Sequence, residues 1–131
     1  MKSTSFEVRT QSREEIVLVT QNVAAALAEF DAGDGICTIY TPHTTSAITI
    51  NEDADPDVRS DLVEAYRAMI PDVRFRHGEG NSDSHLMSSL IGVSVVVPYR
   101  KGKLLLGRWQ GIYFVELDGP RRREISVHLV E

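Results

Sequence analysis

The chain has 131 residues, enough for one domain with a single hydrophobic core. Its 42% hydrophobic and 25% charged residues exclude a disordered protein, and its net charge of -5 argues against general nucleic-acid binding. The lone cysteine, Cys37, cannot form an internal disulfide and lies in an apolar stretch typical of a core residue. Because we find neither a signal segment nor an apolar run of membrane-spanning length, we expect a cytoplasmic protein with no membrane partner.

Strand patterns recur along the chain as runs of β-branched and aromatic residues, several with strict alternation of polar and apolar side chains. The predicted strands are residues 5–10, 15–20, 35–41, 45–51, 93–98, 112–117 and 124–130. The last three follow one another through turns, at 99–103 and 118–120. We therefore expect hairpins in the second half of the chain.

The first predicted helix follows the second strand, where apolar residues from Val23 to Phe30 recur at helical spacing. Thr20 is its expected N-cap, because a threonine hydroxyl can accept a hydrogen bond from a free backbone N–H. We expect Gly33 and Gly35 to end this helix.

Two further helices are predicted between the fourth and fifth strands. One begins with Asp55 as N-cap and Pro56 at the first helical position, and it ends before Pro71. Its expected buried stripe is Val58, Leu62, Ala65, Tyr66 and Met69. The other is a short helix through residue 91, capped by Asp83 or Ser84 and stopped by Gly92.

The order of these elements predicts the fold class. Helices interrupt a series of strands instead of alternating regularly with them, which favours an α+β fold over a doubly wound α/β fold. We expect a single domain over residues 1–131, with a mostly antiparallel or mixed β-sheet and two or three helices.

Three histidines lie in polar segments that could carry chemistry. His77 and His85 bracket a loop rich in polar residues, and His43 lies in a turn between two predicted strands. Three neutral imidazoles that met would form an open site for a metal ion. Their spacing is not that of a helical zinc site, so capping, backbone hydrogen bonding or exposure is the alternative.

Glu116 shares one face of its predicted strand with apolar residues and therefore needs either a partner or a raised pKa. Arg121, Arg122 and Arg123 follow the next turn and could supply that partner, bind an anion, or form a solvated cationic turn. Trp109 is either a ligand platform or a core residue, and the adjacent Gln110 raises the chance that it borders a site.

Several short segments, taken together and in this order, resemble the YjbQ family. They are HTTSA at 43–47, INEDADPDVR at 50–59, HL at 85–86 with SLIG at 89–92, LGRWQGI at 106–112 and DGPR at 118–121. The resemblance spans the chain from about residue 5 to its end. It implies a small α+β protein that assembles as a homotrimer. The activity it implies is secondary thiamine-phosphate synthase, which condenses a pyrimidine diphosphate with a thiazole phosphate and releases pyrophosphate.

The resemblance also implies roles for single residues. His43, His77 and His85 are expected to bind a metal ion or an anion. Either Asp53 or Glu116 is expected to act as a base. The residues expected to bind the ligand are Asn51, Trp109, Gln110 and Arg121. The chain departs from the family pattern at Ser84, where members usually have Ala, and at Arg108, where they usually have Thr. Arg108 is expected to add a cation near the site.

We therefore expect a trimeric enzyme that acts on a phosphorylated small molecule with a divalent metal. Three imidazoles prefer zinc or another transition metal, whereas the release of pyrophosphate would suit magnesium, so the site fits the implied activity only in part. A metal-dependent hydrolase is the second interpretation. A non-catalytic trimer that binds metal or ligand is the third.

Overall fold

Eight strands and three helices make up the protein in the computed structural model, which describes residues 1–131. They are β1 (Lys2–Arg9), β2 (Glu15–Leu18), α1 (Thr20–Glu29), β3 (Gly35–Tyr40), β4 (Ser46–Glu52), α2 (Pro56–Ala68), α3 (Ser82–Ile91), β5 (Ser94–Arg100), β6 (Lys103–Leu104), β7 (Gln110–Glu116) and β8 (Arg122–Val130). All strand pairs are antiparallel. The predicted α+β class is confirmed.

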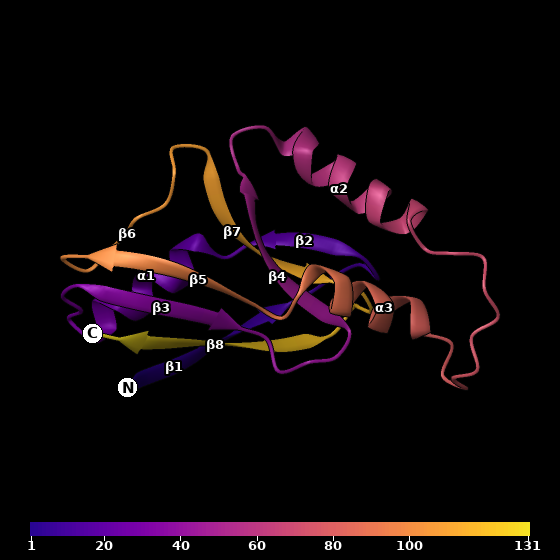
Figure 1. Cartoon of the computed structure of the whole chain (residues 1–131), viewed down its shortest axis with the longest axis horizontal. Coiled ribbons are helices and arrows are strands. Elements are labelled where there is room, and N and C mark those ends of the chain that lie inside the picture. Colours follow the sequence, from indigo (N-terminus) through magenta and orange to yellow (C-terminus); the bar gives the residue numbers. More distant parts are fainter.

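The strands form two sheets, one with the order β1-β8-β3-β5-β6 and one with the order β2-β7-β4. Their inner faces and helix α1 enclose the main core, which includes Cys37 as expected (Figure 1). Strand β7 alternates between two cores. Ile112 and Phe114 belong to the main core, while Tyr113 and Val115 belong to a second, smaller one. The predicted faces of this strand are confirmed.

Helices α2 and α3 accompany the second core, on the outer side of the three-stranded sheet (Figure 1). Leu62 and Tyr66 of α2 pack against that core, but no residue of α2 is fully buried. Ala65 is exposed and Met69, the C-cap residue, is 60% exposed, so the predicted buried stripe is wrong at these two positions.

The predicted ends of α1 are wrong. Thr20 is the first helical residue, and Val19 is in the N-cap position without a side-chain cap. The Thr20 hydroxyl accepts a hydrogen bond from the backbone N–H of Ile112 at 2.9 Å instead, so it ties the helix to β7. The helix ends at Glu29 with Phe30 as its C-cap, and Gly35 begins strand β3.

The other helix ends are mixed in outcome. Asp55 caps α2 as predicted, because its carboxylate accepts a hydrogen bond from the Asp57 N–H at 2.9 Å. The predicted cap of α3 by Asp83 or Ser84 is wrong, since Asn81 holds the N-cap position with no side-chain cap. Gly92 ends α3 as predicted, with a φ of 102° that disfavours other residues.

The outer face of the five-stranded sheet carries exposed apolar side chains. Ile36 of β3, Val96 of β5 and Val130 of β8 are 51%, 58% and 56% exposed. Ile36 and Val130 are direct cross-strand partners, and Val96 pairs with Thr38, which lies on the same face of β3 as Ile36. The three side chains therefore share the outer face, and we call them the apolar strip. Among the helices, none combines the length and the apolar character needed to cross a membrane.

Candidate functional site

A wide pocket of about 700 Å³ opens where the β3–β4 turn, the start of α3 and the β7–β8 turn meet. Its lining is almost entirely polar. The lining includes the cations Arg13, Arg121 and Arg123 together with two of the three predicted histidines, His43 and His85. We call this space the polar pocket.

His43 is held in one tautomer. Its Nε2 atom accepts a hydrogen bond from the backbone N–H of Glu124 at 3.0 Å, so the neutral ring carries its proton on Nδ1. Burial, reinforced by the charge of Arg123, lowers the pKa of His43 below its usual value and favours that neutral ring. His43 therefore offers a hydrogen-bond donor. A metal ion would have to displace the bond from Glu124.

His77 and His85 lie together, with their ring centroids 5.5 Å apart and nearly perpendicular. His77 Nε2 also lies 3.8 Å from the Glu79 carboxylate. However, no group of three or more His, Cys, Asp or Glu side chains is arranged to hold a metal ion. The structure thus brings His43 and His85 into one pocket and His77 beside His85, but it does not arrange the three as ligands within one chain.

Glu116 is completely buried and pairs with Arg123, which is 2% exposed. Arg123 Nε donates to the carboxylate at 2.8 Å, and its Nη2 also donates to the hydroxyl of Thr45 at 2.8 Å. The Thr10 hydroxyl and two backbone N–H groups complete five hydrogen bonds to Glu116. The expected cationic partner is confirmed and is Arg123. The lone pairs of the Glu116 carboxylate are all engaged in these hydrogen bonds. The geometry therefore favours a structural role for Glu116, holding Arg123 in place, over its predicted role as a base.

Arg121 stands at the rim of the polar pocket, with half of its side chain exposed. Its guanidinium donates to the Asp118 carboxylate at 3.1 Å, and the Asn81 amide nitrogen donates to the same oxygen at 2.9 Å. Asn81 Oδ1 is buried and has no hydrogen-bond partner. The pocket is therefore lined by one half-exposed cation and by a residue whose buried acceptor is unsatisfied.

Four other predicted site residues lie elsewhere. Asn51, Asp53, Trp109 and Gln110 gather where β4 ends and β7 begins, since the Asp53 N–H donates to the Trp109 carbonyl at 2.9 Å. Glu116 lies six positions further along β7, which corresponds to about 20 Å of strand. Within one chain, the predicted residues thus form two clusters at opposite ends of the same strand pair.

The second cluster is open to solvent. Trp109 is 53% exposed, and the Arg108 guanidinium lies over its ring at 4.8 Å from the centroid. Gln110 Oε1 accepts a hydrogen bond from the Gly107 N–H at 2.8 Å, which folds the preceding loop. Arg108 was expected to add a cation near the site. Within one chain it lies beside Trp109 and does not line the polar pocket.

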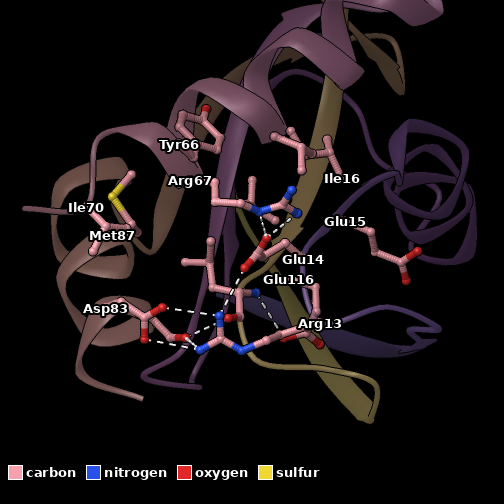
Figure 2. A pocket seen from close by; sticks show the side chains of 14 residues that line it. Arg13, Glu14, Glu15, Ile16, Tyr66, Arg67, Ile70, Asp83, Met87 and Glu116 are labelled. Carbon is pink, nitrogen blue, oxygen red and sulfur yellow. Dashed lines mark hydrogen bonds and ion pairs between the residues drawn. The ribbon is translucent and has the colours of Figure 1, made fainter. Parts of the chain in front are cut away.

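Arg13 is a residue of the polar pocket that was not predicted from the sequence. Its guanidinium makes a bidentate pair with Asp83, with both N···O distances at 3.1 Å (Figure 2). Burial opposes ionisation of Asp83, but the hydrogen bonds from Arg13 and the Ser84 backbone outweigh it, so the pKa of Asp83 is lowered. Seventy residues separate the two partners, and no local pattern announces such a pair.

Comparison with known proteins places the chain among a set of close relatives. The family model described as "UPF0047 protein YjbQ-like" matches residues 4–131. The UPF0047 protein MJ1081 of Methanocaldococcus jannaschii is 48% identical over 126 residues, covering 95% of this chain and 91% of that protein. The UPF0047 protein YugU of Bacillus subtilis is 42% identical, covering 96% and 97%.

Solved structures agree with this relationship. A YjbQ/UPF0047-family protein from Clostridium acetobutylicum has a TM-score of 0.93 and 41% identity, covering 97% of this chain and 99% of that one. The hypothetical protein APE1520 from Aeropyrum pernix K1 also has a TM-score of 0.93, with 38% identity and coverage of 99% and 98%. The names of these relatives state a family and no activity.

Proposed function

The chain belongs to the YjbQ-like UPF0047 family, and we propose that it is an enzyme that binds a phosphorylated small molecule in the polar pocket. The observation that carries this proposal is the gathering of Arg13, Arg121 and Arg123 around one cavity of a chain whose net charge is -5. Guanidinium groups bind phosphate through paired N–H groups. The donor on His43 would orient the rest of the ligand.

The reaction class we propose is a transfer that expels pyrophosphate, as in the thiamine-phosphate synthesis implied by the family resemblance. Such a transfer needs neutralisation of the leaving group and little covalent chemistry from the protein. Arg121 would take up charge on the leaving phosphate, and the His43 Nδ1–H would donate to a phosphate oxygen.

A divalent ion belongs to this proposal, and two donor sets could hold it. Glu79 and Asp118 in the polar pocket supply carboxylates, which magnesium takes together with substrate phosphate oxygens. His77 and His85 supply imidazoles for zinc or another transition metal. In either set, the ion would neutralise phosphate charge.

We also propose assembly as a homotrimer. The exposed apolar strip of Ile36, Val96 and Val130 supports it, because such a strip on an uncovered sheet suits a subunit contact. The cluster at Trp109 supports it as well. A closed ring of identical subunits could bring that end of one subunit to the polar pocket of the next, with Asn51, Asp53 and Gln110 serving the neighbouring site.

A metal-dependent hydrolase is the second candidate, favoured by the proximity of His77, His85 and Glu79. In that case product would form from one phosphorylated substrate alone, and transition metal would be found in the purified protein but not in His85→Ala. A non-catalytic binding trimer would bind its ligand in fixed stoichiometry without turnover.

The experiment that tests the first proposal is calorimetric titration with pyrophosphate, with and without magnesium. Arg121→Gln should weaken binding by about tenfold or more, the usual range for a lost charge-assisted contact. Arg122→Gln is the matched control, because Arg122 lies outside the pocket and pairs with Glu7. Equal affinities for the wild type and Arg121→Gln would contradict the proposed site. Thiamine phosphate formation from the two family substrates would then test the reaction.

A further inference from the structure

A second cavity, of about 270 Å³, lies beneath helix α2. Its apolar surface comes from Ile16 of β2, Met87 of α3 and Val115 of β7, with Val63, Tyr66 and Ile70 from the α2 side (Figure 2). We call this space the apolar cavity. Half of the residues that line it are apolar, and the chain's own side chains leave it unfilled.

The roof of the apolar cavity, helix α2, is only partly buried. No residue of α2 is fully buried, and the residues that follow it, 71–80, are all exposed. Besides the packing of Leu62, Val63 and Tyr66 on the second core, Arg67 ties the helix to the sheet side, because its Nε donates to the Glu14 carboxylate at 2.6 Å at the edge of the cavity (Figure 2). An exposed ion pair of this kind contributes little free energy, so partly buried apolar side chains account for most of the contact between α2 and the rest of the chain.

The apolar cavity adjoins the polar pocket. Arg13 lines both spaces. The start of α3 also lies between them, because Asp83 and Ser84 face the apolar cavity while Asn81 and His85 face the polar pocket. Arg13 and the first turn of α3 therefore form a boundary that the apolar cavity and the polar pocket share.

We propose that the apolar cavity binds the uncharged carbon portion of the same compound whose phosphate is held in the polar pocket. This inference rests on the proposed function and adds a substrate class to it. The volume lies just below the range of about 300–1,000 Å³ typical of drug-sized ligands, so the carbon portion is a single ring or a short branched chain. The thioether of Met87 and the ring of Tyr66 are suited to pack on such a ring.

The test compares inorganic phosphate with phenyl phosphate by calorimetric titration. Wild type should bind phenyl phosphate at least about tenfold more tightly, because burial of one ring contributes a factor of that order or more. Val63→Phe should fill the cavity and abolish this gain while leaving the affinity for inorganic phosphate unchanged, which also shows that the variant is folded. Ala65→Phe is the matched control, since it adds the same ring to an exposed position of α2.

The outcomes separate the two proposals. If wild type binds inorganic phosphate and phenyl phosphate equally, the apolar cavity is not part of the site, and the inference fails while the polar pocket stands. If wild type binds neither, the proposed function fails and the inference fails with it. If Val63→Phe keeps the full gain for phenyl phosphate, the ring binds elsewhere and the inference is again overturned.

Discussion

Removal of Arg123 should destabilise the protein strongly, because it would leave Glu116 buried without its cation. Both side chains are almost inaccessible to solvent, at 2% and 0% exposure. Loss of one partner of a buried pair typically costs about 3–5 kcal/mol. In Arg123→Met, Glu116 keeps hydrogen bonds from Thr10 and two backbone N–H groups, so we expect the lower end, about 3 kcal/mol.

The assay is urea unfolding followed by far-ultraviolet circular dichroism at one fixed protein concentration. With a dependence on urea of about 1–3 kcal/mol per molar, the midpoint of Arg123→Met should fall by about 1–3 M. The double variant Glu116→Gln with Arg123→Met should recover part of the loss, since no charge then stays buried. A loss below about 1 kcal/mol in the single variant would refute this reasoning.

Three further predictions concern the His43 ring, the core thiol and the outer sheet face. Because burial and then Arg123 lower the folded-state pKa of His43 below the unfolded value of about 6.5, protons favour the unfolded chain, and stability should fall as the pH drops below that value. His43→Gln should show a smaller fall in urea midpoint between about pH 7.5 and pH 5, and parallel curves would contradict this. Burial raises the pKa of the Cys37 thiol to about 11. A thiol reagent at neutral pH should therefore react slowly with the folded protein and quickly with the protein unfolded in urea. Fast labelling of the folded protein would contradict this and show that strand β3 opens. Val96→Lys places a charge among the exposed apolar side chains of the outer sheet face and should lower the oligomeric state measured by sedimentation equilibrium, whereas Ser5→Lys on edge strand β1 should not. An unchanged oligomeric state in both variants would show that the outer face is not a subunit contact.

The strand periods and the fold class were predictable because they depend on local alternation. The two faces of β7 and the burial of Glu116 followed from the same rule, and its partner Arg123 lies only seven residues away. The helix ends were less predictable, because the hydroxyl of Thr20 serves a strand far along the chain and so cannot cap. Local propensity does not report such tertiary hydrogen bonds.

The division of the predicted site could not be foreseen from the sequence. Antiparallel pairing of β4 with β7 sets Glu52 opposite Gln110 and Ser46 opposite Glu116. Gln110 and Glu116 belong to the same strand and to the same predicted site, but they lie at opposite ends of this strand pair. For the same reason Arg13 escaped notice, since its partner Asp83 is reached only through the fold.

The position of Arg13 at the boundary shared by the apolar cavity and the polar pocket has a thermodynamic consequence. Arg13 has one guanidinium group, and at present Asp83 and Glu14 occupy it from the side of the apolar cavity. An anion that drew Arg13 toward the polar pocket would weaken the hold on Asp83 and so change the charge at the edge of the neighbouring space. Occupancy of one compartment would then alter affinity in the other by a factor that is equal in both directions.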